Sequence, residues 1–533
     1  MAPAEPLADP LRERDLATVL ARRIADRPDA TWIATPDHNY TYAEMGDRSA
    51  RLAQGLSTLG PAPGETILSM LPDGIEVIDL WCALARTGII EVPLNNHYLG
   101  DILAYMINDS LARDMVIHTD FLDRLPPIAD RLDHLTRLIV TGDGDLPEGL
   151  DRFTILPLAD LYADTLFAGE SPRYNDIMAV MYTSGTTGPS KGAMMTHAHV
   201  YEYAFGVTEM LALRDTDTYF APIPLFHIAG RFAVVYAACI AGCTAVVQGG
   251  FHTDSFWDDI RRHGATASFL LGAMASFLYR QPETPADADT PLDRLLMVPL
   301  IPEVEDFKRR FACRVSTTWG GTEMNCPTRS GFDLHDAKTC GRVAEDRYEV
   351  RLVDADDEEV PNGTPGEAVV RAKRPWIMSA GYWNHPEWTA KAWRNQWLHT
   401  GDMLVRDDVG NFAFVDRVKD AIRRRGENIS SMEVEQQILA HPSVLECAVI
   451  PVASADTEQE VMAVLVLKPG AAWEPHALID FLTPRMPAFM IPRYLDRADA
   501  LPKTQTGKIQ KFPLREAGLT ATTWDRGTKR RGG

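Results

Sequence analysis

Long apolar runs and an excess of positive charge are both missing from this 533-residue sequence. Its longest apolar run, residues 232–247, is broken by Gly242 and is shorter than the roughly 20 residues that a helix needs to cross a bilayer. Lys and Arg number 53 against 74 Asp and Glu, a formal net charge of −21. Nucleic-acid backbones are bound by clustered Lys and Arg, so this acidic balance argues against a nucleic-acid partner, although a small site can still be locally basic. The short apolar run argues against a membrane span.

Cysteine is also scarce, with seven residues scattered from Cys82 to Cys447. An odd, scattered set does not build a disulfide framework and suits a reducing cytoplasm. Cys239 and Cys243 are four residues apart, but no further Cys or His follows at metal-ligand spacing, so packing in the core is the better interpretation. The first 20 residues carry charges where a signal peptide needs an apolar centre, so we expect no secretion signal and a cytoplasmic protein.

The pattern of apolar residues predicts a large first domain. From about residue 40 to residue 180, and again after residue 196, helical patterns alternate with short β-branched runs, as in α/β layers. Between residues 343 and 414, short runs separated by turns such as Pro361-Asn362-Gly363 indicate antiparallel strands. We expect a domain over residues 1–416 that combines layered α/β subdomains with a small β-barrel-like region.

The last part of the chain has a different pattern. A basic segment follows Asp416, a helix is predicted to begin at Ser430 or Ser431, and strands are predicted at residues 446–451 and 461–468. A segment of about a hundred residues with this pattern suits a compact α+β unit. We expect a small, mobile α+β domain over residues 417–533, with a hinge near Arg417–Lys419.

A segment rich in Gly, Ser and Thr, residues 183–192 (TSGTTGPSKG), follows a strand-like run at residues 177–182. Glycines let the backbone turn and expose N–H groups, hydroxyls add donors, and Lys191 adds a positive charge, so the segment can cradle an anion. A flexible loop without function is the alternative. The P-loop pattern G-x4-G-K-[ST] is not met, because Gly192 follows Lys191, which argues against a P-loop nucleotide hydrolase.

This segment resembles, at nearly every position, the signature loop of the adenylate-forming superfamily, which comprises acyl- and aryl-CoA synthetases, adenylation domains and luciferases. Further segments resemble later motifs of that family in the same order: Trp319-Gly320-Gly321-Thr322-Glu323, residues 398–402 (LHTGD), 416–420 (DRVKD) with 425–429 (RGENI), and 502–508 (PKTQTGK). The likeness extends from about residue 40 to residue 516. Residues 92–109 and 423–435 are similar to the carnitine and crotonobetaine CoA ligase-like branch.

The resemblance implies a ligase that uses ATP to activate a carboxylic acid as an acyl-AMP, releases pyrophosphate, and then forms an acyl-CoA thioester. Two anions meet in the first step, so the site needs Mg²⁺ and cationic donors. The family likeness places Glu323 on the metal, Thr322 at the α-phosphate, Asp402 on the ribose hydroxyls and Arg417 beside it, while Lys508 would bridge the carboxylate and the α-phosphate. Contacts to ATP are also implied for Thr183, Ser184, Gly185, Thr186, Thr187, Gly188, Lys191, Trp319, Gly320 and Gly321.

The second half-reaction is implied to use the same site after the small domain rotates about Lys419. Arg423, Arg424 and Arg425 beside Gly426 could serve a polyanionic cofactor, and this segment would then lie along the path of the thiol, the alternative being a solvated basic turn. Coenzyme A in solution is the favoured acceptor, because the chain ends soon after the lysine motif where a peptide synthetase would continue into a carrier domain. The acid is a small-molecule substrate.

His227 bears on the identity of the acid. It stands where amino-acid-activating domains carry an Asp for the substrate ammonium, so an amino acid is disfavoured, and it is similar to the aromatic gate of acyl-CoA synthetases. A satisfied structural histidine is the alternative. We expect Arg231 to point outward rather than to meet a carboxylated substrate. Residues 297–302 (MVPLIP) replace the small residues of many relatives, and long-chain fatty acids are not favoured.

Other functions on the same fold stay open. One is an acyl-AMP ligase that delivers the acyl group to a separate carrier protein, and another is a non-catalytic binding protein. The presence of Lys191, Glu323, Asp402 and Lys508 together argues against the second, because an inactive site has no chemical need for all four. No residue indicates luciferase-like oxygen chemistry. The sequence leaves the oligomeric state open, with a homodimer as the assembly considered.

Overall fold

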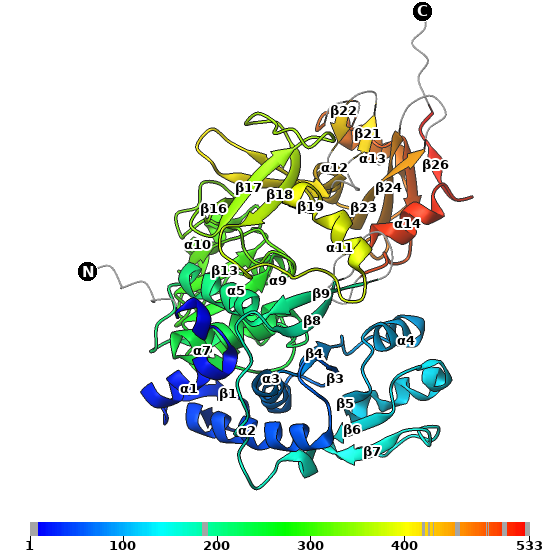
Figure 1. Cartoon of the computed structure of the whole chain (residues 1–533). Helices are drawn as coiled ribbons and strands as arrows, with labels where there is room; N and C mark the ends of the chain where they lie inside the picture. Colours follow the sequence, from blue (N-terminus) through cyan, green and yellow to red (C-terminus); the bar gives the residue numbers. More distant parts are fainter. Residues whose placement is uncertain are drawn as a thin grey trace, which may run out of the picture.

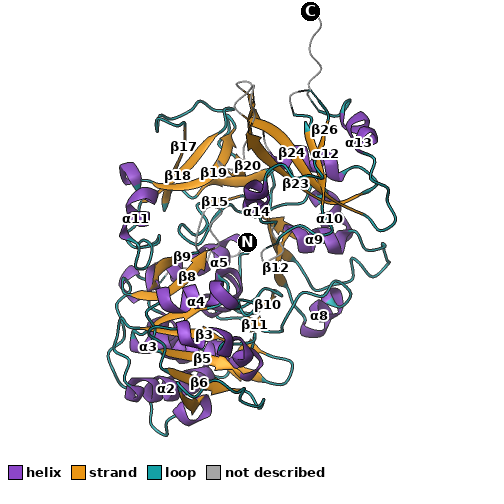
Figure 2. Ribbon diagram, turned by 90° about the vertical axis from the view of Figure 1, so that its right-hand side faces the viewer, coloured by secondary structure: helices purple, strands orange, loops and turns teal. Residues whose placement is uncertain are grey.

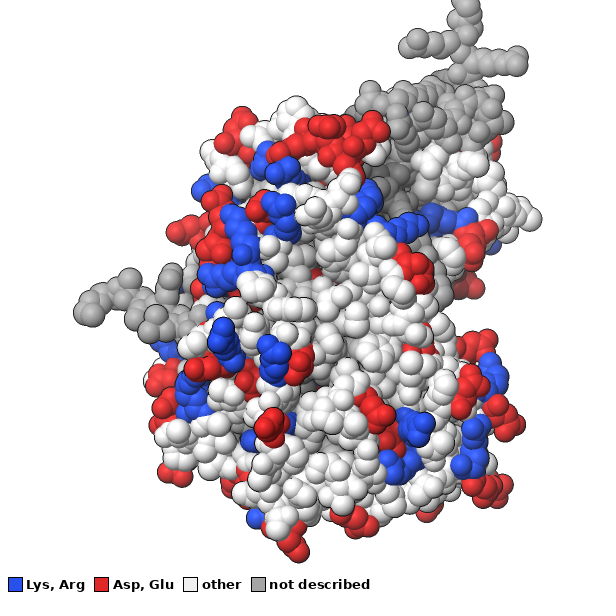
Figure 3. All heavy atoms as spheres, viewed as in Figure 1, with Lys and Arg blue, Asp and Glu red and all other residues white. Residues whose placement is uncertain are grey.

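The computed structural model describes residues 9–183, 190–417, 422–424, 427–429, 431–453, 459–486, 488, 490–503 and 509–527. Two large sheets with their helices fill the lower and middle parts of the molecule, and two further β-rich units lie above them (Figure 1). On the face drawn in Figure 3, charged side chains gather toward the rim of the lower part, whereas the centre is mostly uncharged.

One seven-stranded sheet has the order β7-β6-β5-β3-β4-β8-β9 and is parallel except for the pair β8–β9. Its strands are β3 (Thr66–Met70), β4 (Ile90–Pro93), β5 (Asp114–His118), β6 (Arg137–Thr141), β7 (Thr154–Pro157), β8 (Ile177–Thr183) and β9 (Lys191–Thr196). Its helices are α3 (Ile75–Thr87) and α4 (Gly100–Asp109), with the short turns η2 (Thr119–Arg124), η3 (Pro126–Arg131) and η4 (Leu158–Leu161). The α3 helix ends at Gly88, whose φ of +73° suits a residue without Cβ.

The other seven-stranded sheet has the order β14-β13-β12-β10-β11-β1-β2 and is parallel except for β1–β2. Its strands are β1 (Thr31–Ala34), β2 (Asn39–Thr41), β10 (Thr218–Phe220), β11 (Thr244–Val246), β12 (Ala267–Leu271), β13 (Arg294–Val298) and β14 (Arg314–Ser316). Further helices are η1 (Leu11–Glu13), α1 (Leu16–Asp26), α2 (Tyr42–Leu59), α5 (His197–Met210), α8 (Phe256–His263), α9 (Gly272–Tyr279) and α10 (Val304–Arg310). Helices α8, α9 and α10 contact β10, β12 and β14 of this sheet, whereas α5 contacts β8 and β9 of the first sheet. Thr41 and Glu44 form a capping box that starts α2.

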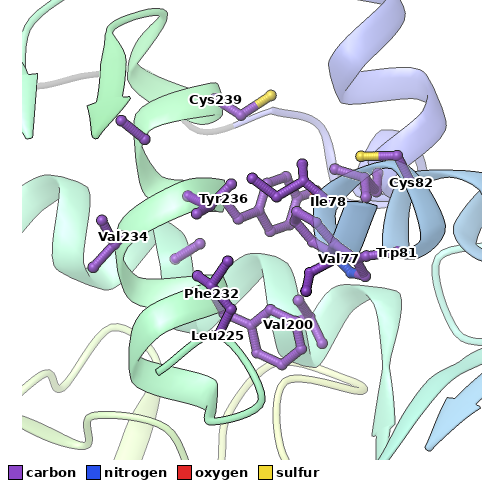
Figure 4. Close-up of a cluster of buried hydrophobic side chains, with 14 of the residues drawn as sticks. Val77, Ile78, Trp81, Cys82, Val200, Leu225, Phe232, Val234, Tyr236 and Cys239 are labelled. Carbon is purple, nitrogen blue, oxygen red and sulfur yellow. The ribbon is translucent and has the colours of Figure 1, made fainter. Parts of the chain in front are cut away.

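One apolar core joins the two sheets. The apolar run that follows His227 is a continuous helical segment, α6 (Ile228–Gly230), η5 (Arg231–Tyr236, a π-helix) and α7 (Ala237–Ala241), packed against α3 and α5. Figure 4 shows Trp81 of α3 beside Phe232 and Tyr236, with ring centroids 5.9 and 5.6 Å away. Cys239 and Cys243 are buried in this core, which confirms that they pack there. No helix in the described ranges is long and apolar enough to cross a membrane.

The predicted antiparallel part forms a six-stranded sheet of order β15-β16-β20-β19-β18-β17. Its strands are β15 (Thr328–Arg329), β16 (Thr339–Val343), β17 (Tyr348–Val353), β18 (Gly366–Ala372), β19 (Leu398–Arg406) and β20 (Phe412–Arg417). The connection between β18 and β19 contains α11 (Pro386–Ala392) and η6 (Arg394–Gln396). Because β20 ends at Arg417, the sheet ends where the hinge is expected.

The C-terminal part is an α+β unit with its own apolar core. A four-stranded sheet contains β23 (Val444–Ala453), β24 (Gln459–Leu467), β25 (Tyr494–Arg497) and β26 (Trp524–Asp525), and a two-stranded sheet contains β21 (Ile422–Arg424) and β22 (Glu427–Ile429). The helices are α12 (Ser431–Leu439), α13 (Pro475–Leu482) and α14 (Lys511–Ala517). Strands β23 and β24 and helices α12 and α13 lie in the upper part of Figure 2. The predicted class, layered α/β subdomains followed by an antiparallel region and a small α+β domain, is confirmed.

Candidate active site

The parallel strands of the second large sheet bring several predicted motif segments to one edge. The segments that follow β10, β12, β13 and β14 lie at the carboxyl ends of these strands: residues 221–227, 272–274, 299–302 and 317–325. The chain passes from β10 to β11 on one side and then to β12 on the other, and a ligand crevice is expected where the order reverses. His227 and the Trp319–Glu323 motif therefore belong to the same edge.

The Trp319–Glu323 motif is a tight loop that closes on itself. The Gly321 N–H donates to the Asn325 carbonyl at 3.0 Å, and the Asn325 N–H donates back to the Gly321 carbonyl at 2.9 Å. A Cβ on Gly320 would lie 1.8 Å from the Asn325 carbonyl oxygen, so only glycine fits there. The loop therefore carries Thr322 and Glu323, both half-buried, at the edge formed by the carboxyl ends of these strands.

A carboxylate, a phenol and an ammonium group lie together beside this loop. The Tyr382 hydroxyl donates a hydrogen bond to Oε1 of Glu323 at 2.9 Å. Nζ of Lys191 lies 5.0 Å from the centroid of the Tyr382 ring and 5.7 Å from that of Trp388. Among the residues that the structure describes, none forms an ion pair with Lys191, and Tyr382 is the only hydrogen-bond partner of the Glu323 carboxylate. Within the described residues, the Lys191 charge therefore contacts aromatic rings and no carboxylate.

The segment that contains Tyr382 is hydrogen-bonded to the β8–β9 hairpin. Met194 donates its N–H to the Gly381 carbonyl at 2.9 Å, and Trp383 donates its N–H to the Gly192 carbonyl at 2.7 Å. Lys191 is the first residue of β9. The phenol ring and the ammonium group therefore belong to one hydrogen-bonded framework.

A buried carboxylate ties this framework to α4. Asp109, the last residue of α4, accepts a hydrogen bond from the Tyr182 hydroxyl at 2.6 Å and lies 2.9 Å from Nε2 of His385. Tyr105, on the same helix, donates to the Ser190 carbonyl at 3.1 Å. The strand before the predicted phosphate segment and the residues after it are thus both held by α4.

The predicted phosphate cradle and the hinge are only partly within the described residues. Thr183 ends β8, and its hydroxyl donates to the Lys191 carbonyl at 3.4 Å, so the two ends of the cradle meet as a hairpin. Arg417 and Arg423 are placed by their backbones in β20 and β21. Nine predicted site residues lie outside the described residues: Ser184, Gly185, Thr186, Thr187, Gly188, Lys419, Arg425, Gly426 and Lys508.

Asp402 occupies a buried position beside the motif loop. Nε1 of Trp319 donates to Oδ2 of Asp402 at 2.9 Å, and the Asp402 N–H donates to the Thr400 hydroxyl at 3.1 Å. Asp402 pairs with Arg417 in the antiparallel register of β19 and β20. The structure thus brings together the two residues for which a shared contact to ribose is implied, one from the expected hinge.

The expectation that Arg231 points outward is wrong. Its side chain is 2% exposed and forms an ion pair with Glu91 of β4, which is 1% exposed. Nε of Arg231 donates to the Leu225 carbonyl at 2.9 Å, and Glu91 also accepts a hydrogen bond from the Ser69 hydroxyl at 2.6 Å. The helical run after His227 packs into the core between the sheets, where the buried Glu91 requires a cation.

The loop before Arg231 is held through the backbone of Leu225. Asp73 accepts the Leu225 N–H at 2.7 Å, while Arg231 holds the carbonyl. Burial raises the pKa of Asp73, and the Leu225 bond and the Arg231 charge oppose that shift. His227 is half-buried and accepts the Ala229 N–H at Nδ1, 3.1 Å away, so its neutral ring carries the proton on Nε2.

Some of the bulky residues 297–302 lie in the core, and others are exposed at the carboxyl-end edge of the sheet. Met297 is fully buried, Val298 is half-buried, and Pro299 is exposed. A Cβ on Gly272 would lie 2.8 Å from the Pro299 carbonyl oxygen, so the segments after β12 and β13 are in close contact. Apolar side chains therefore form this side of the edge.

Tyr382, Asp109 and His385 are site residues that the sequence analysis did not predict. The sequence does mark this region, because five of the chain's 11 Trp residues lie within residues 376–397. A cluster of aromatic side chains in a segment of turns is unusual at a solvated surface. Nothing in it identifies Glu323, 59 residues earlier in the chain, as the partner of Tyr382.

Comparisons with known proteins agree with the motifs. The profile of the family described as "AMP-binding enzyme" matches residues 20–383, and that of the "AMP-binding enzyme C-terminal domain" matches residues 433–508. A crotonobetaine/carnitine–CoA ligase from Salmonella agona (strain SL483) is 30% identical over 485 residues, which cover 89% of this chain and 93% of that protein.

Solved structures with the same fold include two with bound nucleotides. The anthranilate CoA ligase AuaEII in complex with anthranoyl-AMP superposes with a TM-score of 0.83 at 26% identity, covering 96% of this chain and 98% of that chain. ATP-bound MatB from Rhodopseudomonas palustris also gives a TM-score of 0.83 at 26% identity, covering 94% and 98%. These similarities extend over both the large and the small part of the chain.

Proposed function

This chain belongs to the AMP-binding enzyme family and is an ATP-dependent ligase that activates a carboxylic acid as an acyl-AMP and then forms an acyl-CoA thioester; we propose that Lys191, Tyr382 and Glu323 serve the first step. In that step a carboxylate oxygen attacks the α-phosphorus of ATP, and the bond to pyrophosphate breaks. The observation that carries this assignment is the Lys191 ammonium, which no carboxylate among the described residues neutralises. Such a cation can offset the charge of the phosphates.

Glu323 is the residue that would hold Mg²⁺. The fit is good, because Mg²⁺ keeps several waters and binds through one or two carboxylates plus substrate phosphates. The described ranges contain no cluster of three or more metal-binding side chains, so a cage made only of protein ligands is not seen there. When bound, the ion withdraws charge from the phosphates and stabilises the leaving pyrophosphate. Thr322, next to Glu323, would donate to the α-phosphate.

Asp402 is proposed to accept the two ribose hydroxyls of ATP, since one ionised carboxylate can accept both bonds. The Trp319 N–H fixes its orientation, and Arg417, opposite in the register, is its proposed partner. Gly320 and Gly321 let the motif loop approach the nucleotide. Thr183 and residues 184–188 are proposed to cradle the phosphates.

The small domain is proposed to supply the remaining groups. Lys508 would bridge the incoming carboxylate and the α-phosphate in adenylation. Rotation about Lys419 would then bring Arg423, Arg425 and Gly426 toward the thiol, so both half-reactions would use one site. This proposal requires a boundary between residues 1–416 and 417–533, and the end of β20 at Arg417 supports it.

The acid is proposed to be compact, and His227 is proposed to stand between its pocket and the path of the thiol. Crotonobetaine, carnitine, anthranilate and benzoate appear in the names of similar ligases, and all are small acids. Half-buried Val298 and exposed Pro299, at the edge that also carries His227, support a short apolar wall. Long-chain fatty acids are not proposed as substrates.

A reducing compartment, the cytoplasm, is proposed because all seven cysteines are unpaired. A homodimer stays a prediction that light scattering would test.

Pyrophosphate release is the experiment that tests the proposed function. The purified chain, ATP and Mg²⁺ would be screened over short, aromatic and branched acids, with AMP release measured with and without coenzyme A. We expect coenzyme A to increase AMP release and yield a thioester. Transfer only to an added carrier protein would identify the acyl-AMP ligase alternative, and ATP binding without turnover of any acid would favour a binding protein.

A further inference from the structure

Tyr382 contacts both charged groups of the proposed adenylation site. Its hydroxyl donates to Oε1 of Glu323 at 2.9 Å, and the face of its ring lies 5.0 Å from Nζ of Lys191. The side chain is buried, at 7% exposed. The phenol hydroxyl therefore acts as a hydrogen-bond donor to this carboxylate.

The ring of Tyr382 cannot turn freely. The Tyr382 N–H donates to the Thr389 hydroxyl at 2.8 Å, its backbone forms an antiparallel bridge with Ala193, and its ring meets the Trp393 ring edge-on with centroids 5.9 Å apart. Buried aromatic contacts and hydrogen bonds of this kind hold a side chain in one rotamer. The hydroxyl is thus a fixed donor.

Glu323 is held by the same segment at two points. Its backbone carbonyl accepts the Ser379 N–H at 2.9 Å, and its carboxylate accepts the Tyr382 hydroxyl three residues later in the chain. We propose that Tyr382 is a positioning residue that fixes the Glu323 carboxylate for the divalent cation of MgATP. This inference rests on the proposed function. Partners that orient a metal-binding carboxylate typically change metal affinity or activity about 10- to 100-fold when removed.

Tyr382→Phe is the variant that tests this role, because it keeps the ring beneath Lys191 and removes only the donor. Calorimetry without acid substrate would measure binding of ATP with Mg²⁺ and of ATP with EDTA. We expect MgATP to bind about 10-fold more weakly and metal-free ATP to bind as in the wild type. The Mg²⁺ concentration that half-saturates pyrophosphate release should rise.

Tyr162→Phe is the matched control. The Tyr162 hydroxyl donates to the buried carboxylate of Asp79 at 2.8 Å, the same chemistry in a different part of the molecule. Both variants should lower the thermal midpoint by similar amounts, but only Tyr382→Phe should change the response to Mg²⁺.

An unchanged Mg²⁺ dependence and unchanged MgATP affinity in Tyr382→Phe would overturn the inference, and so would equal loss of metal-free ATP binding. A wild-type chain that adenylates no acid would instead refute the proposed function. Comparison of the wild type with the variant therefore separates the two failures.

Discussion

Lys191 and Arg231 are both cations at the ends of motif segments, yet the protein surrounds them differently. Arg231 is 2% exposed, forms an ion pair with Glu91 and donates to the Leu225 carbonyl. Lys191 is half-buried and lies over the rings of Tyr382 and Trp388. Within the described part of the chain, no carboxylate pairs with it.

The difference separates structural charge from functional charge. A buried ion pair is neutral as a unit, so Glu91 neutralises the charge of Arg231 inside the protein, and this charge cannot attract a ligand. Aromatic rings attract a cation without neutralising it, so Lys191 keeps its charge at the mouth of the β8–β9 hairpin. Removing Arg231 should therefore affect stability first, and removing Lys191 should affect the reaction first.

Arg231→Met should produce the largest loss. It leaves Glu91 charged, buried and without its cation, which typically destabilises a protein by about 3–5 kcal/mol. The midpoint of urea unfolding, measured by tryptophan fluorescence, should fall accordingly.

The double variant Arg231→Met with Glu91→Leu is the control for Arg231. It replaces the ion pair by apolar side chains of similar size, so most of the lost stability should return. Its activity should stay low, because the Leu225 carbonyl no longer has the guanidinium donor. A double variant as unstable as the single one would show that packing, not the uncompensated charge, explains the loss.

Lys191→Met should lower the activity much more than the stability. Among the described residues, the Lys191 side chain would lose two cation–π contacts, each worth about 0.5–1 kcal/mol, so unfolding should change little. Pyrophosphate release should fall by about 10²–10³, the usual effect of removing one preorganised charge donor. The matched control is Lys308→Met on α10, where Lys308 pairs with Glu305 at 3.0 Å on the surface. Loss of folding in Lys191→Met would place Lys191 with Arg231 as a structural charge.

Much of the fold could be predicted from the sequence because its signals are local. The strands β3, β5 and β8, the helix α3 with its glycine end, and the antiparallel strands β17 and β18 all follow from periodicity and turn residues. The motif residues Lys191, Glu323 and Asp402 could also be named, since each lies in a short ordered pattern.

The partners of these residues could not be predicted because they are distant in the chain. Arg231 and Glu91 are 140 residues apart, and Tyr382 and Glu323 are 59 residues apart. A charge in an apolar run can face solvent or pair inside the core, and local pattern does not distinguish the two. The choice depends on the packing of η5 between the two sheets.

His199 is a third residue to compare with Arg231 and Lys191, because its buried side chain becomes a cation only when it is protonated. It is fully buried in α5, and burial lowers its pKa to about 3, with the Asn325 side chain opposing the shift. The unfolded chain binds a proton near pH 6.5 and the folded chain does not, so this contribution to stability is complete above pH 6.5 and is lost as pH falls toward 3. Between pH 7 and pH 5 the loss is about 2 kcal/mol for this residue.

Urea unfolding at both pH values should show a smaller acid-induced drop in the free energy of unfolding for His199→Asn than for the wild type. The exposed His97 provides the matched control, His97→Asn, which should keep the wild-type drop. An equal drop in all three proteins would mean that α5 accommodates the charged ring and that burial alone does not exclude a third cation from the fold.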